Sequence, residues 1–144
     1  MSSVLARKRG ISEMEFYRRA YELNIKIPQA IMNEKIVPKR WRTWFAPSFN
    51  DLLDKLMGYI IAANNVFPYN DDLCAERKRY QQYAIDTLDR IDDKIQQLVD
   101  LLFPNNIDAD HHLPFALLEI GELIDKEHDL LKGWKSHTKV YSRK

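Results

Sequence analysis

Apolar residues that recur at alternating steps of three and four positions are the feature that most constrains the fold of this chain. The longest such run begins at Leu73 and ends at Leu102, and most of the residues between its apolar positions are charged or polar. Because one turn of an α-helix takes 3.6 residues, this spacing places the apolar side chains on one helix face. The run therefore predicts a helix over about residues 72–103 that buries one face in a core.

Three further stretches show the same spacing, and no stretch shows the alternation of a β-strand. We predict four helices, over about residues 12–35, 48–65, 72–103 and 114–134. Short connections favour antiparallel neighbours, so the predicted fold class is all-α, an up-down-up-down four-helix bundle. The bundle is expected to span residues 12–137, with a basic N-terminal arm over 1–11 and a basic tail over 138–144.

Prolines and a capping signal define the expected limits and shape of the first two helices more closely. Ser12, with Glu15 three residues later, has the pattern of a capping box at the start of the first helix. Pro28 lies inside the first helical pattern and lacks an N–H, so we expect a kink one turn before it. The dipeptide PS at 47–48 predicts the start of the second helix, which leaves PKRWRTW (38–44) in the connection before it.

The PKRWRTW segment combines three cations with two of the three tryptophans of the chain. Its rings could cap the core while its arginines face water, or the segment could present both to a partner. The two interpretations are compatible. We expect one tryptophan to anchor the segment in the core and the flanking cations to face outward.

The second and fourth predicted helices carry apolar residues on more than one face, in LLDKLMGYIIAA and LPFALLEIGELI. An isolated bundle needs one buried stripe on each helix. The wider stripes predict either a second buried surface, and hence oligomerisation, or a larger core. The residues alone leave both open.

Composition limits the class of protein. The chain has 144 residues, of which 45% are hydrophobic and 30% charged, as in an ordinary single globular domain. No apolar run approaches the roughly 18 residues that span a bilayer, and no apolar core follows the basic residues at the start. A single cysteine, Cys74, excludes an intrachain disulfide. These features predict a cytoplasmic protein with no membrane association.

The formal net charge of +1 hides an asymmetry along the chain. Residues 1–45 sum to +6, residues 46–134 to −9 and residues 135–144 to +4. Basic ends and an acidic middle indicate a localised surface for a polyanion, or self-association of opposite patches.

Motifs of catalysis are missing from the sequence. It contains no G-x-S-x-G, no glycine-rich phosphate loop and no H-E-x-x-H, so we predict a protein that is not an enzyme and has no cofactor. Asp125-x-x-His128 resembles half of a di-metal bundle motif, and His111 and His112 lie in a polar loop. A metal-dependent hydrolase or oxidase using His128 is the least favoured hypothesis.

Four motifs carry a family resemblance that covers about residues 12–137: PKRWR, IAANNVFP, ERKRYQQYAI and EIGELIDKEHDLLKGWKS. With them the chain resembles the four-helix-bundle family that contains the accessory variability determinant (Avd) of diversity-generating retroelements. The same superfamily includes proteins encoded by bacterial 23S rRNA intervening sequences.

The resemblance implies a function as well as a fold. Avd proteins are non-enzymatic, form a pentameric barrel and bind the retroelement's reverse transcriptase and template RNA in support of mutagenic cDNA synthesis. By resemblance, this chain would form a ring-like homo-oligomer. The positions that would contact RNA or transcriptase are Lys39, Arg40, Trp41, Arg42, Arg77, Lys78, Arg79, Lys132 and Lys135.

One departure from the family keeps a second function in view. Avd proteins tend to be strongly basic, whereas this chain has an acidic middle that would repel RNA wherever it is exposed. The alternative is a helical-bundle protein-interaction module that binds a partner through an apolar groove, without nucleic acid.

Overall fold

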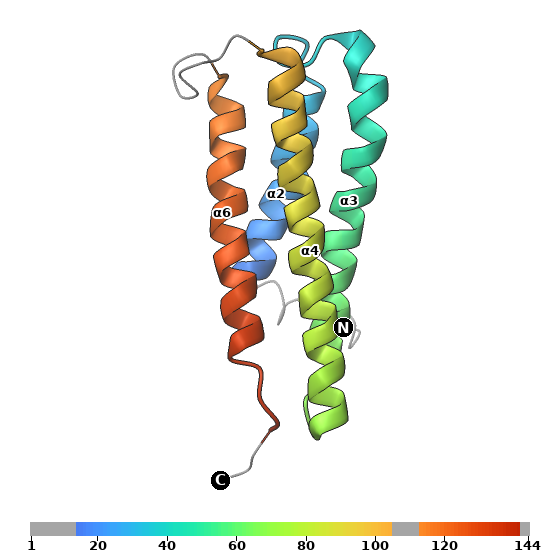
Figure 1. Cartoon of the computed structure of the whole chain (residues 1–144), viewed down its shortest axis with the longest axis vertical. Coiled ribbons are helices and arrows are strands. Elements are labelled where there is room, and N and C mark those ends of the chain that lie inside the picture. The colour runs from blue at the N-terminus through green and yellow to red at the C-terminus, as the bar shows by residue number, and fades with distance from the viewer. Residues whose placement is uncertain (1–13, 105–112, 142–144) are drawn as a thin grey trace, which may run out of the picture.

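Four long helices make up the regular structure of the residues that the computed structural model describes, 14–104 and 113–141. They are α2 (Glu15–Ile31), α3 (Lys39–Asn65), α4 (Asp71–Leu102) and α6 (Phe115–Ser136). Figure 1 shows them lying side by side, with successive helices running in opposite directions. The predicted all-α fold, four helices packed as a bundle, is confirmed. None of the described helices is long and apolar enough to cross a membrane.

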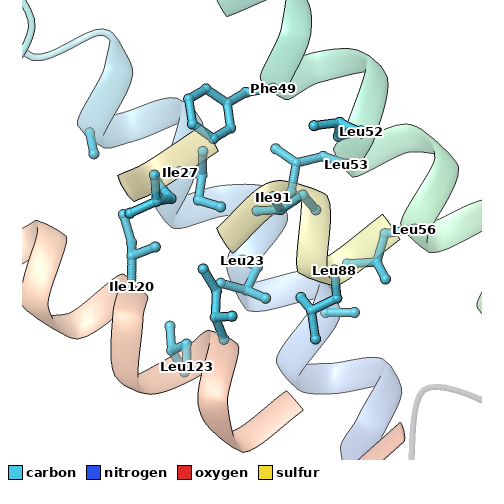
Figure 2. Packing of buried hydrophobic residues seen from close by; sticks show 14 of the residues in the cluster. Leu23, Ile27, Phe49, Leu52, Leu53, Leu56, Leu88, Ile91, Ile120 and Leu123 are labelled. Carbon is cyan, nitrogen blue, oxygen red and sulfur yellow. The ribbon is translucent and has the colours of Figure 1, made fainter. Parts of the chain in front are cut away.

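The helices enclose one core. Helix α2 packs against α3 and α6, and α4 packs against the same two helices. Figure 2 shows side chains from all four helices meeting inside, among them Ile27, Phe49, Ile91 and Ile120. Each such fully buried side chain contributes about 1.5–3 kcal/mol relative to an exposed one. The free energy gained by this burial can outweigh local sequence signals, such as a proline, that favour the start or end of a helix.

The start of the second helix is the clearest difference from the sequence-based prediction. Helix α3 begins at Lys39 rather than at Ser48, and Pro47 lies inside it. The reason is a ladder of aromatic rings at four-residue steps: Trp41 to Phe45 and Phe45 to Phe49 each have ring centroids 6.2 Å apart. Keeping this ladder on the core face favours a continuous helix, despite the backbone hydrogen bond that Pro47 removes. The PKRWRTW segment is therefore the beginning of a helix and not a connection.

The other helix limits lie close to the predicted ones. Helix α4 is capped by Asn70, whose Oδ1 accepts a 2.8 Å hydrogen bond from the backbone N–H of Leu73. Helix α6 runs past Gly133 to Ser136. Helix α2 ends at Ile31, before the predicted residue 35, and the kink predicted before Pro28 stays a prediction. The capping box involves Ser12, which lies outside the described residues.

The first residues of the C-terminal tail, 138–141, contact the bundle. Thr138 is buried, and its hydroxyl donates to the backbone carbonyl of Trp134 at 2.9 Å. The Nε2 of Gln81, itself fully buried on α4, donates to the same hydroxyl at 2.8 Å. The backbone N–H of Tyr141 donates to the carbonyl of Pro68 at 2.7 Å, so the described part of the tail lies against the end of the bundle.

Candidate functional site

The predicted contact residues fall at two opposite ends of the bundle. Residues 39–42 form the first turn of α3, at the end where α4 finishes (Figure 1). Arg77, Lys78 and Arg79 lie near the start of α4, and Lys132 and Lys135 near the end of α6. Helix α3 has 27 residues. With a rise of about 1.5 Å per residue, its length separates the two sets by roughly 40 Å. The predicted residues therefore form two candidate surfaces.

At the start of α3, two of the four predicted residues have internal contacts. Trp41 is half-buried against the core, which confirms the predicted tryptophan anchor. The Nε of Arg42 donates to the Val37 carbonyl at 3.3 Å, and its Nη2 lies 3.1 Å from the Glu34 carboxylate. Arg42 thus holds the connection between α2 and α3 instead of facing outward.

Lys39 and Arg40 are exposed, together with Lys35 and Trp44; we call these four residues the α3 patch. Trp44 is 60% exposed, unlike Trp41. It is not among the predicted contact residues, although it lies one helical turn after Arg40. No acidic residue occupies the first turn of α3, and Pro38 provides no side-chain cap. The partial positive charge of a helix N-terminus therefore adds to the cations of the patch, which favours a polyanion.

At the opposite end, three predicted lysines from two helices meet at one hollow. It has a volume of about 560 Å³ and lies between α4 and α6, lined by Lys78, Gln82, Ile85, Asp89, His128, Lys132, Lys135 and Ser136. The Lys135 ammonium donates to Gln82 Oε1 at 2.6 Å, which ties the two helices together. The Nε2 of His128 lies 3.1 Å from Asp89 Oδ1.

A second hollow continues along the same pair of helices. Its volume is about 520 Å³, and it is lined by Asp92, Ile95, Gln96, Val99, Asp100, Phe103, Pro104, Leu113, Leu117, Leu118 and Gly121. The α4 residues that line the two hollows include 78, 82, 85, 89, 92, 96 and 99, at steps of four and three, and Phe103, the C-cap of α4, continues the series. This spacing keeps them on one helix face. We call the combined surface the α4–α6 groove.

The middle of the α4–α6 groove is acidic. Burial raises the pKa of the Asp92 carboxyl, and the nearby carboxylates of Asp125, Asp93 and Asp89 raise it further, while His128 acts in the opposite direction. Like charges this close disfavour further negative charge. The groove therefore has lysines at one end, carboxylates in the middle and apolar side chains at the other end.

Arg77 and Arg79 do not line this groove. The Arg77 guanidinium lies over the ring of Trp134, 5.4 Å from its centroid, and donates to the Val66 carbonyl at 3.3 Å. Burial lowers the pKa of Arg77. Trp134 stacks in turn on Phe16, with centroids 3.9 Å apart. Arg77 thus links α4 to α6 and to the end of α3, whereas Arg79 is exposed on another face of α4.

Groups that could bind a metal ion do not assemble in the described ranges. Within residues 14–104 and 113–141, no group of three or more His, Cys, Asp or Glu side chains is placed to hold a metal ion. His111 and His112 lie outside the described residues. Cys74 is buried, and its Sγ lies 3.9 Å from the Thr138 carbonyl oxygen. This geometry fits a thiol that fills space at the end of the core.

Comparison with known proteins identifies no relative of this chain. The chain matches no family model, no curated protein and no solved structure. The two surfaces and the motifs of the sequence are therefore the basis for a functional assignment.

Proposed function

We propose that this protein is a non-enzymatic accessory protein that binds RNA and a reverse transcriptase, in the manner of the Avd family that its motifs resemble. The observation that carries the proposal is the α3 patch, where exposed Lys39 and Arg40 adjoin the exposed ring of Trp44 at a helix N-terminus. Cations bind phosphates, and aromatic faces stack on unpaired bases.

The two surfaces suit different partners. A single-stranded RNA would meet cations and an aromatic ring at the α3 patch. In the α4–α6 groove it would meet the carboxylates of Asp89, Asp92 and Asp125 beside the lysines. We therefore assign RNA to the α3 patch and the transcriptase to the groove. Lys78, Lys132 and Lys135 become protein contacts, and Arg42 and Arg77 become supports of the structure.

The proposal includes self-association into a ring, pentameric by the same resemblance. Helix α2 and its two capping residues support it with an exposed apolar stripe, which consists of Met14 at the N-cap, Tyr21 and Ile25 within the helix and Met32 at the C-cap, spaced by seven, four and seven residues. This spacing keeps the four side chains on one side of the helix, as in a coiled-coil seam. The wide stripes predicted on the second and fourth helices contribute less, because most of their apolar residues belong to the core.

Binding of a fluorescent single-stranded RNA tests the assignment to the α3 patch. We expect Lys39→Ala/Arg40→Ala to weaken binding and to reduce the slope of log affinity against log salt by about 0.7 for each phosphate that is no longer neutralised. Trp44→Ala should weaken binding without changing that slope, since the ring carries no charge. Arg18→Ala/Arg90→Ala removes two exposed cations, one from α2 and one from α4, that are not among the predicted contact residues, and serves as the matched control.

Equal affinities for the wild type and the Lys39→Ala/Arg40→Ala variant would refute the α3 patch as the RNA site. RNA binding no stronger than that of an unrelated neutral protein at physiological salt would favour the second candidate, a protein-interaction module without nucleic acid. The observation that favours this candidate is the α4–α6 groove, whose mixed charges and apolar end suit a protein.

A further inference from the structure

We infer that the α4–α6 groove is a docking site for one amphipathic helix of a partner protein, with an acidic start, a basic middle and an apolar end. This deepens the proposed function by naming the kind of segment that the groove accepts. The inference depends on the proposed function in one respect: it takes the partner in the groove to be a protein. It does not require the α3 patch to bind RNA.

The shape of the groove fits a helix. Its α4 side runs from Lys78 to Phe103, a length of roughly 38 Å at 1.5 Å per residue, which corresponds to a partner helix of about 25 residues. The two hollows along it, about 560 and 520 Å³, are lined by residues of both α4 and α6. Two adjacent helices form the groove into which a third helix packs its ridge of side chains.

The distribution of charge along the groove determines which order of acidic and basic residues a partner helix needs. The lysine end presents Lys78, Lys132 and Lys135, which attract carboxylates. About three to four turns after Lys78 along α4, Asp89 and Asp92 attract cations, and His128, which pairs with Asp89, offsets the carboxylates only in part. A phosphate backbone is negative along its whole length and cannot match this alternation. A peptide helix can change the sign of its charge from turn to turn.

The apolar end supplies a position for an anchoring side chain. Val99, Phe103 and Leu118 are half-buried there, beside Gly121. A Cβ atom added to Gly121 would meet no atom within 4 Å, so the space over this glycine is open, and we call this open space on the groove wall the notch. A leucine or phenylalanine from a partner would bury apolar surface in that notch.

The direction of the partner helix follows from its own dipole. Acidic residues are most stable in the first turn of a helix, so the acidic start belongs at the N-terminus. This start lies against the lysine end, which is also the start of α4. The docked helix would therefore run parallel to α4 and antiparallel to α6 (Figure 1).

Two synthetic 25-residue helical peptides of identical composition test the inference. One has the order acidic, basic, apolar, and the other exchanges its acidic and basic thirds. Fluorescence anisotropy with the full chain should show at least a tenfold higher affinity for the first peptide. The preference should shrink as salt is raised, because it arises from charge pairs. Equal binding of the two peptides, or no binding of either, would overturn the inference.

Two glycine substitutions provide a matched pair. Gly121→Leu fills the notch and should lower the affinity of the first peptide at least tenfold. Gly58→Leu on α3 also places its Cβ where no atom lies within 4 Å, but outside the groove, and should leave the affinity unchanged. Both changes replace glycine by a better helix former, so unfolding does not account for a loss of binding. Circular dichroism of the two variants checks this directly.

Other occupants of the groove give different results. If Gly121→Leu changes the mass of the protein alone in light scattering, a second copy covers the groove and the inference is wrong. If Lys78→Ala/Lys132→Ala abolishes RNA binding while peptide binding is unchanged, RNA occupies the groove and the inference is also wrong. If only the α3 patch variants lose RNA binding, the result supports the proposed RNA site and does not affect the inference that the groove binds a peptide.

Discussion

Replacing Glu127 by glutamine should remove a pH-dependent loss of stability from the bundle. Glu127 lies on α6 with none of its surface exposed, and neither carboxylate oxygen has a hydrogen-bond partner in the part of the chain that the structure describes. Burial raises the pKa of this carboxyl to about 9. Arg19 opposes the shift and Glu15 reinforces it, and Arg19 is already shared with Glu15 and Glu22 on α2.

The sign and size of the effect follow from proton linkage. Below pH 4.5, the usual pKa of glutamate, the carboxyl is neutral in both the folded and the unfolded chain, so its burial costs no ionisation energy. Between pH 4.5 and about 9, only the unfolded chain releases the proton, and the free energy of unfolding falls with rising pH. Each pH unit costs about 1.4 kcal/mol, so the cost reaches roughly 3 kcal/mol at pH 7 and roughly 6 kcal/mol at pH 9.

Urea unfolding of the wild type and of Glu127→Gln, followed by circular dichroism from pH 4.5 to 9, measures this cost. The buried amide adds an offset that does not depend on pH, so the informative quantity is how the difference between the two proteins changes with pH. We expect the variant to gain relative to the wild type by about 1.4 kcal/mol per pH unit. Glu122→Gln, at an exposed position of α6, is the control and should show almost no change. A difference between wild type and Glu127→Gln that stays constant from pH 4.5 to 9 would refute the reasoning.

Three further changes test the packing of the bundle. Thr138→Val should lower the free energy of unfolding by about 1–3 kcal/mol in urea titrations, because the buried Gln81 amide loses its partner; an unchanged midpoint would contradict this. Arg42→Ala should cost about 1–2 kcal/mol, mainly through its bond to the Val37 carbonyl, and hydrogen exchange should rise in the connection between α2 and α3. Gly121→Ala should raise the free energy of unfolding by about 1 kcal/mol through helix propensity, with a higher melting temperature as the readout.

The sequence predicted the limits of a helix correctly where its capping residues and prolines agreed with the packing of the core. Helix α4 begins after the capping Asn70 and ends before Pro104, within one residue of its predicted limits at both ends. At α3 the local signal was misleading. Pro47 indicated a helix start, but burial of the aromatic face from Trp41 to Phe49 extends the helix back to Lys39.

The sequence by itself determined the four helices and which segments carry cationic and aromatic side chains, because helical periodicity, capping and charge are properties of neighbouring residues. Only the tertiary structure decided which of these groups remain available. It engages Arg77 with Trp134, and it brings Lys78 to Lys132 and Lys135 from helices far apart in the chain. It also leaves the carboxylate of Glu127, which the helical spacing from Ile124 to Leu131 places on the core face of α6, fully buried and without a hydrogen-bond partner among the described residues. Such relations depend on which helix faces meet in the bundle, and that is set by the burial of the whole core.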